Sequence, residues 1–261
     1  MKRVAAAFVA LLALLPAASL AQTAVSPSQE PSAVEASDGS TAGRAEVLAA
    51  FTRLVDRGEA RAMFGLPATT FWRRSGELKV ALLAADAESL RSVYQGAAAP
   101  FAATTGVPID LVASGPVPAA GDAVAAFEPE ADLVIIVGPR ERLSELATGS
   151  GFNRGMLARF EIGTWPFMFS FSADERRRGV MLLADDEPER AREASFILAT
   201  VWGLGGVTLG PELTGLIADA EEGPMLTPLG EAVFRLFFHP DLETGKPIAE
   251  TLQRAETLLP Q

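Results

Sequence analysis

Side chains that could support metal or nucleophilic chemistry are scarce in this sequence. The chain of 261 residues contains one histidine, His239, and no cysteine. Zinc sites are usually built from several His and Cys ligands, and Ser-His-Asp or Cys-His catalysis would need His239 as its base. We therefore predict no metal site, no cofactor and no catalytic residue. His239, just before Pro240, is interpreted as a residue at a helix C-terminus that interacts with the helix dipole.

Serine and lysine patterns are also incomplete. Ser150 lies in Gly149-Ser150-Gly151, but the full G-x-S-x-G frame of a nucleophile elbow is absent and no apolar strand precedes it. We interpret Ser150 as a loop residue. A Ser-Lys dyad would have to use Lys79 or Lys246, and nothing in the sequence places either lysine beside a serine.

Two further motifs are better explained by helix ends. The glycine-rich run 203–206 follows a predicted helix, whereas a dinucleotide-binding loop follows a strand. The acidic run Asp185-Asp186-Glu187-Pro188-Glu189 could offer oxygen ligands to calcium, but it lacks the spacing of an EF-hand, and acids with a proline are typical of a helix start. A glycosidase-type pair could be any two of the 33 acids, and the sequence selects none.

The charge balance argues against nucleic acid as a partner. The formal net charge is -11, and it becomes -13 without Lys2 and Arg3 of the predicted signal peptide. That sign repels phosphate backbones and anionic lipids. The one compact basic cluster is Arg176-Arg177-Arg178, which we interpret as a solvated hairpin turn, with an anion site as the alternative.

Residues 1–21 have the pattern of a secretory signal peptide. A basic start precedes an apolar run of 12 residues that ends at Pro16, and Ser19-Leu20-Ala21 fits a cleavage site. The run is shorter than the roughly 20 residues of a membrane-spanning helix, so we expect cleavage near Ala21 rather than an uncleaved anchor. The product would be periplasmic or secreted, without a stable membrane span.

The mature chain is expected to contain a disordered tether, residues 22–43, and a single globular domain, residues 44–261. The tether is rich in Ser, Ala, Thr, Pro and Gly and has few large apolar residues. Because the chain has no cysteine, burial and not disulfides must stabilise the domain.

Hydrophobic periodicity predicts an α+β domain in which a mixed sheet of about four to five strands packs with helices. Residues 131–137 suit a strand buried on both faces. Residues 165–172 and 179–184 suit a hairpin, which leads into a central buried helix around residues 188–204. The remaining predicted strands cover residues 77–84 and 107–113, and the remaining predicted helices cover residues 47–57, 87–104, 140–147, 227–238 and 247–259.

The C-terminal third resembles an uncharacterised family of exported bacterial proteins, often described as lipoproteins, with a degenerate zincin-like metalloprotease organisation. The family pattern places Glu-Glu-Leu-Thr-Gln-x-x-Gly-Leu on the central helix, where this chain has FILATVWGL at 196–204. A later Leu-Thr-x-x-Asp corresponds to LTPLG at 226–230, and an aromatic, a proline turn and a glycine correspond to 238–245. Phe71-Trp72-Arg73-Arg74 resembles the Arg-Trp start of the family's domain.

The resemblance covers the framework and not the polar residues. The two glutamates of the family pattern are Phe196 and Ile197 here, the glutamine is Thr200, and the later acid is Gly230. A lipid anchor is also impossible without a cysteine. The resemblance therefore implies a scaffold whose ancestral polar site has become part of the core, because a buried carboxylate needs a partner and these residues do not.

These observations lead to an expected function without catalysis. We expect a periplasmic or secreted protein that binds an envelope protein or a small ligand on a degenerate metalloprotease-like scaffold. The alternative is a hydrolase of peptides or cell-wall material whose catalytic residues have no recognisable pattern. A solute receptor fits less well, because such receptors need two lobes and the sequence shows no break at its midpoint.

Overall fold

The computed structural model describes residues 42–55, 70–117, 130–149, 167–171, 178–206, 213–220 and 223–260, with only the backbone for 167–171 and 219. All of them belong to one compact unit, Gly39–Gln261. The predicted signal peptide and residues 22–41 of the predicted tether lie outside the described residues.

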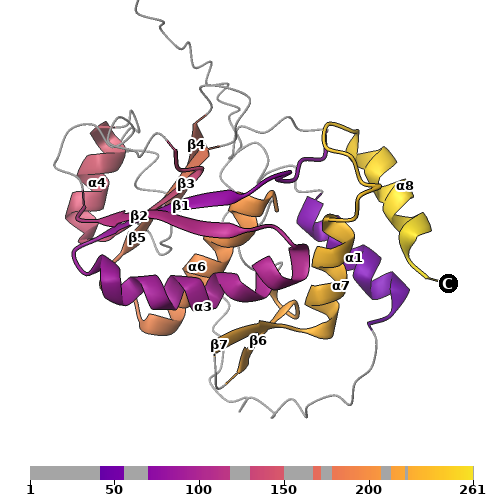
Figure 1. Cartoon of the computed structure of the whole chain (residues 1–261), viewed down its shortest axis with the longest axis horizontal. Helices are drawn as coiled ribbons and strands as arrows, with labels where there is room; N and C mark the ends of the chain where they lie inside the picture. Colours follow the sequence, from indigo (N-terminus) through magenta and orange to yellow (C-terminus); the bar gives the residue numbers. More distant parts are fainter. Residues whose placement is uncertain are drawn as a thin grey trace, which may run out of the picture. The chain divides into compact units, whose positions relative to one another are not determined.

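A five-stranded sheet forms the centre of the unit (Figure 1). Its strand order is β2-β1-β3-β5-β4, in which β2, β1, β3 and β5 are parallel and β4 runs antiparallel to β5. The strands span β1 Leu78–Ala84, β2 Ile109–Gly115, β3 Leu133–Gly138, β4 Phe167–Phe171 and β5 Arg178–Ala184. All six residues of β3 are buried, as the sequence predicts, because neighbouring strands flank it and helices cover both faces.

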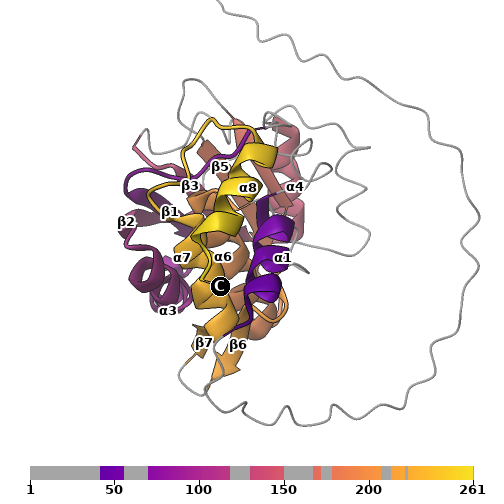
Figure 2. The same cartoon turned by 90° about the vertical axis from the view of Figure 1, so that its right-hand side faces the viewer.

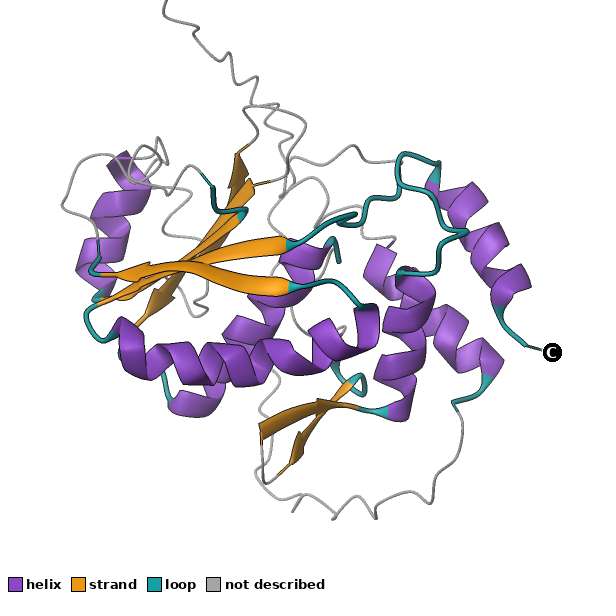
Figure 3. Ribbon diagram, viewed as in Figure 1, coloured by secondary structure: helices purple, strands orange, loops and turns teal. Residues whose placement is uncertain are grey.

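Helices cover the two faces unequally (Figure 3). The larger hydrophobic cluster joins one face of the sheet to α1 (Arg44–Val55), α3 (Ala87–Thr105), α6 (Glu189–Leu204) and α7 (Pro228–Phe237). The smaller cluster joins the opposite face to α4 (Arg140–Gly149) alone among the described helices. Side chains of β1 therefore alternate between the two hydrophobic clusters. Val80 and Leu82 belong to the larger cluster and Ala81 belongs to the smaller one.

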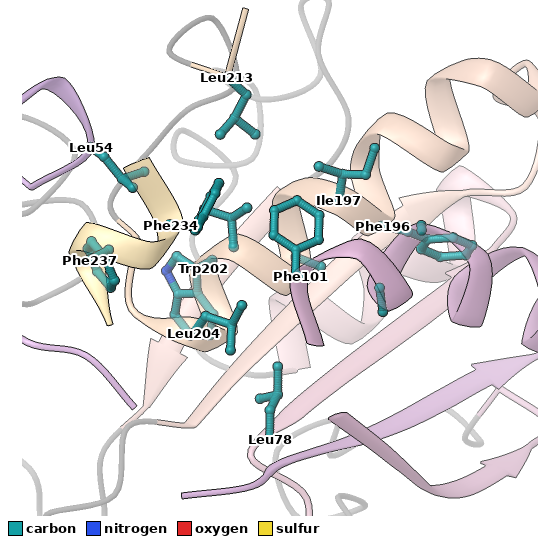
Figure 4. Packing of buried hydrophobic residues seen from close by; sticks show 14 of the residues in the cluster. Leu54, Leu78, Phe101, Phe196, Ile197, Trp202, Leu204, Leu213, Phe234 and Phe237 are labelled. Atoms are coloured by element: carbon teal, nitrogen blue, oxygen red, sulfur yellow. The ribbon is translucent and has the colours of Figure 1, made fainter. Parts of the chain in front are cut away.

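Helix α6 is the centre of the larger cluster, which confirms the prediction of a central buried helix. Nine of its residues are buried, including Phe196, Trp202 and Leu204. Figure 4 shows these side chains among hydrophobic groups from α1, α3, α7 and β1. The helix ends at Gly205, whose φ of 117° is the left-handed conformation that a non-glycine residue rarely adopts.

Side chains cap the starts of two helices. The Asp86 carboxylate accepts a hydrogen bond from Ser89 N at the start of α3. The Thr227 hydroxyl accepts one from Gly230 N at the start of α7, with Pro228 at the first helical position.

The last helix, α8 (Ile248–Leu258), packs beside α1 (Figure 2). Arg44 at the start of α1 donates hydrogen bonds to the carbonyls of Glu256 at 2.8 Å and Leu259 at 3.4 Å. These bonds satisfy carbonyls that the last turn of a helix leaves without partners. The start of α1 is thereby fixed to the end of α8.

One element of the fold has no clear pattern in the sequence. Residues interpreted as a loop contain a short antiparallel hairpin, β6 (Ile217–Ala220) and β7 (Gly223–Leu226). Strands of four residues are too short to show a clear alternation of polar and apolar side chains.

The prediction of a mixed sheet of four to five strands packed with helices is confirmed, and the parallel order of four strands is new information from the structure. No helix in the described part of the chain is both long enough and apolar enough to cross a bilayer.

Candidate functional site

The helix positions that the resemblance assigns to polar residues lie in the hydrophobic core. Phe196 and Thr200 are 0% exposed and Ile197 is 6% exposed. The Phe196 ring packs edge to face against Tyr94 of α3, with 5.6 Å between centroids. Ile197 and Phe101 of α3 belong to the same cluster (Figure 4). These packed side chains fill the place where a polar site would have to be.

The polar atoms in this region are few and already bonded. The Thr200 hydroxyl donates to the carbonyl of Phe196 at 2.9 Å, and its oxygen lies 3.5 Å from the hydroxyl oxygen of Tyr94. Burial raises the pKa of Tyr94 well above its ordinary value, because an ionised phenolate would be desolvated. Tyr94 therefore stays neutral and is not suited to be a general base.

The motif at residues 226–230 also has a structural role. Thr227 Oγ1 caps α7 and donates to the carbonyl of Gly215 at 2.7 Å. Gly230, where the family pattern has an acid, faces the backbone of Leu216, and a β-carbon at residue 230 would overlap the carbonyl oxygen of Leu216. An aspartate therefore does not fit at this position without a movement of the backbone.

His239 lies at the C-terminal end of α7, and nothing in the structure contradicts the predicted interaction with the helix dipole. Helix α7 ends at Phe237 with Phe238 as its C-cap, so His239 lies just beyond it. Its Nδ1 accepts a hydrogen bond from Asp241 N at 3.2 Å. This hydrogen bond stabilises the turn that follows α7.

Other sequence candidates have structural roles in the described residues. The run 203–206 forms the end of α6, as predicted. Asp186 and Glu187 both accept from Arg140 at the start of α4, at 3.0 and 2.6 Å, and the hydrogen bond from Arg140 lowers the pKa of Asp186. Within the described ranges no group of three or more His, Cys, Asp or Glu side chains could hold a metal ion. Ser150, Arg176 and Arg177 lie outside the described residues, and Arg178 begins β5.

Three segments singled out by the resemblance meet in space, which the sequence analysis did not predict. Phe71 N donates to the carbonyl of Lys246, and Gly245 N donates to the carbonyl of Phe71, both at 2.8 Å. On the other side of this segment, Arg74 N donates to the carbonyl of Leu204 at 3.0 Å. The segment 70–74 therefore lies between the end of α6 and the turn 238–247 that joins α7 to α8.

A buried ion pair anchors this junction to the sheet. The Arg74 guanidinium lies 3.0 Å from the Asp132 carboxylate, and their side chains are only 11% and 8% exposed. Arg74 Nε also donates to the carbonyl of Gly203, and Asp132 accepts from Lys79 N. Within the described residues, these further partners are backbone groups at the end of α6 and the start of β1, which gives the pair a structural role.

A depression of about 500 Å³ lies between the turn after α7 and helix α8. Two of its lining residues, Leu242 and Thr251, are buried, and the others are mostly charged. Arg254 pairs with Asp241 across it, and Lys246 pairs with Glu250 at 3.4 Å and Glu243 at 3.7 Å. Its volume is in the range of small-molecule sites, but its lining is more polar than most of them.

No protein-family model, no curated protein and no solved structure matches this chain.

Proposed function

We propose that this chain is a non-catalytic protein of the periplasm or the extracellular medium that binds an envelope protein or a small ligand. In this proposal residues 1–21 direct export and are removed near Ala21. The observation that carries the non-catalytic part is the packing of Phe196, Ile197 and Thr200 within the core.

The proposal includes a zincin-like scaffold, with α6 in the place of the metal-binding helix. Two features support this assignment. Helix α6 directly follows the β4–β5 hairpin, and it ends in the glycine turn at Gly205. Metalloproteases carry their metal-binding helix between a hairpin and a glycine-rich turn, which is the position of α6 in this chain.

The apolar residues at 196 and 197 of α6, where the family pattern has glutamates, have a physical explanation within this proposal. A carboxylate at residue 196 would face the ring of Tyr94 in a dry core, and an unpaired buried charge costs several kcal/mol or forces the group to be neutral. Phenylalanine at the same place contributes buried apolar area instead. Such a change stabilises the fold and removes a metal ligand in one step.

The binding part of the proposal is supported by the region around the turn 238–247. The depression beside α8 is lined by both acidic and basic side chains. The backbone of the turn that carries some of them is held in place by its hydrogen bonds to Phe71. Pairs that are about half exposed, such as Arg254 with Asp241, contribute little to stability and can exchange partners at low cost.

Metal analysis and thermal unfolding test the non-catalytic proposal. We expect the purified mature chain to contain no stoichiometric zinc, and EDTA to leave its unfolding temperature unchanged, because the described residues contain no group of three side chains that could hold a metal ion. A known zinc protease treated in parallel would lose its metal and serves as the positive control. Zinc that EDTA removes with a fall in the unfolding temperature, or a hydrolysis that one carboxylate substitution abolishes, would favour the hydrolase alternative.

A further inference from the structure

Arg73 and Arg74, which are neighbours in the segment 70–74, have different surroundings. Arg74 points to the sheet and is paired with Asp132. Arg73 is partly buried, yet within the described part of the chain its guanidinium makes no ion pair and no hydrogen bond. In a chain with 33 acids and a net charge of -11, a partly desolvated cation without a carboxylate partner is unusual.

The backbone that carries Arg73 is held on both sides. Arg73 N donates to Thr244 Oγ1 at 3.4 Å, and the Thr244 hydroxyl donates to the carbonyl of Arg73 at 3.3 Å. Behind it lies Gly205, where a β-carbon would come within 2.8 Å of Arg73 Cα. The base of the side chain is therefore fixed before any ligand binds, which lowers the entropic cost of binding.

An aromatic ring orients the guanidinium without satisfying its donors. Arg73 Cζ lies 5.8 Å from the ring centroid of Phe238. A cation over a ring is stabilised electrostatically, but the N–H groups in the guanidinium plane stay free to donate to a ligand. Burial lowers the pKa of Arg73 below its ordinary value, although an arginine remains charged at neutral pH, so its charge is only partly compensated by the protein.

We propose that Arg73 is the anchoring residue of a binding site for a single carboxylate group on the ligand. The planar guanidinium matches a carboxylate with two parallel hydrogen bonds. The negative charge of the whole chain opposes polyanions such as nucleic acids, so an isolated carboxylate is the anion that fits best. The inference deepens the proposed function and rests on it, because it names the chemistry of the bound ligand.

Titration with three probes tests the site. The probes are acetate, a capped Ala-Glu-Ala peptide and a capped Ala-Gln-Ala peptide, followed by the NMR signal of the Arg73 side-chain N–H. We expect a saturable shift with at least one of the two carboxylate probes and none with the glutamine peptide. If acetate binds as tightly as the glutamate peptide, a small carboxylate is sufficient as the ligand. If only the glutamate peptide binds, the ligand is a segment of a protein.

Substitutions of single arginines distinguish a binding site at Arg73 from an effect of the net charge of the chain. Binding measured by calorimetry should weaken about tenfold in Arg73→Gln, since a hydrogen bond to a charged group is lost. Arg73→Lys should retain part of the affinity, because it keeps the charge but not the planar fork. Arg235→Gln changes the net charge equally at a more exposed arginine, which pairs with Glu231 on α7, and should bind like the parent chain.

Two results would overturn the inference. One is the absence of a saturable shift with both carboxylate probes in a chain whose unfolding temperature is normal. The other is an equal loss of affinity in Arg235→Gln and Arg73→Gln, which would indicate only the net charge. Either result would leave the non-catalytic proposal standing, because zinc content and the response to EDTA are measured independently.

Discussion

Gly230 occupies the third position of α7, where its N–H is capped by the hydroxyl of Thr227. Its lack of a side chain allows the start of α7 to pack directly on the carbonyl of Leu216, which also accepts a hydrogen bond from Thr227 N at 2.9 Å. One residue therefore determines how closely the helix approaches the chain segment before β6. Steric fit, and not backbone conformation, requires glycine here.

A pair of glycine substitutions tests this point. Gly230→Ala should destabilise the chain by about 1–3 kcal/mol, because the new methyl group overlaps backbone that cannot move easily. Gly96→Ala, inside α3 with open space around it, should stabilise the chain by roughly 0.5–1 kcal/mol through helix propensity. Urea unfolding of both variants gives the comparison, and equal effects of the two substitutions would contradict the steric explanation.

The ion pair of Arg74 and Asp132 links three elements of the fold. Asp132 immediately precedes β3, Arg74 precedes β1, and Gly203, a second partner of Arg74, lies in the last turn of α6. The pair thus joins the amino ends of two neighbouring parallel strands to the carboxyl end of the central helix. Basic side chains are favourable at that end of a helix, because the carbonyls there lack partners.

Breaking one half of this pair should be costly. Asp132→Asn is expected to destabilise the chain by about 3 kcal/mol, because the buried Arg74 guanidinium loses the charge of its Asp132 partner. Asp186→Asn is the matched control, since it removes an acid from an exposed pair with Arg140 and should change stability little. The free energies of unfolding in urea provide the test, and the linking role fails if the two variants behave alike.

At the scale of the whole molecule, Tyr94 connects the packing of α3 and α6 to the stability of the unit. It is the single tyrosine of the chain, it is 1% exposed, and its ring packs on Phe196. Burial raises its pKa above the ordinary value of 10.0. The unfolded chain therefore loses the phenolic proton at a lower pH than the folded chain does.

This difference predicts alkaline destabilisation with a defined sign. The contribution of Tyr94 is complete below about pH 10, and stability then falls by about 1.4 kcal/mol per pH unit, because the unfolded state binds fewer protons. Tyr94→Phe should remove this part of the slope. Lys246, whose pKa is raised by its hydrogen bond to Glu250, titrates in both proteins, so its effect cancels in the comparison.

Unfolding curves of the parent chain and Tyr94→Phe from about pH 9 to 11 measure this slope. Because the chain has one tyrosine, tyrosinate absorbance should appear together with unfolding and not before it. Tyrosinate that forms in the folded chain near its ordinary pKa, or identical slopes for the two proteins, would contradict a buried and neutral Tyr94.

Local patterns were sufficient for most elements of the fold. The β-branched apolar run in residues 131–137 predicted β3 as a strand buried on both faces, and the apolar residues 195–204 predicted the central helix. Thr227 and Pro228 marked the start of α7. These predictions succeeded because helix caps and hydrophobic periods depend on residues within one or two turns of each other. The four-residue strands β6 and β7 are too short for such a period.

Long-range packing determined the rest, including the candidate site. Arg73 and Arg74 are identical neighbours in the sequence, but one is paired with Asp132 and the other lies over Phe238. No local pattern can separate them, because their partners are 58 and 165 positions away in the chain. Local sequence therefore established most of the elements and the scarcity of metal ligands, whereas the strand order and the Arg73 guanidinium, which has no ion pair among the described residues, follow from contacts that only the folded chain brings together.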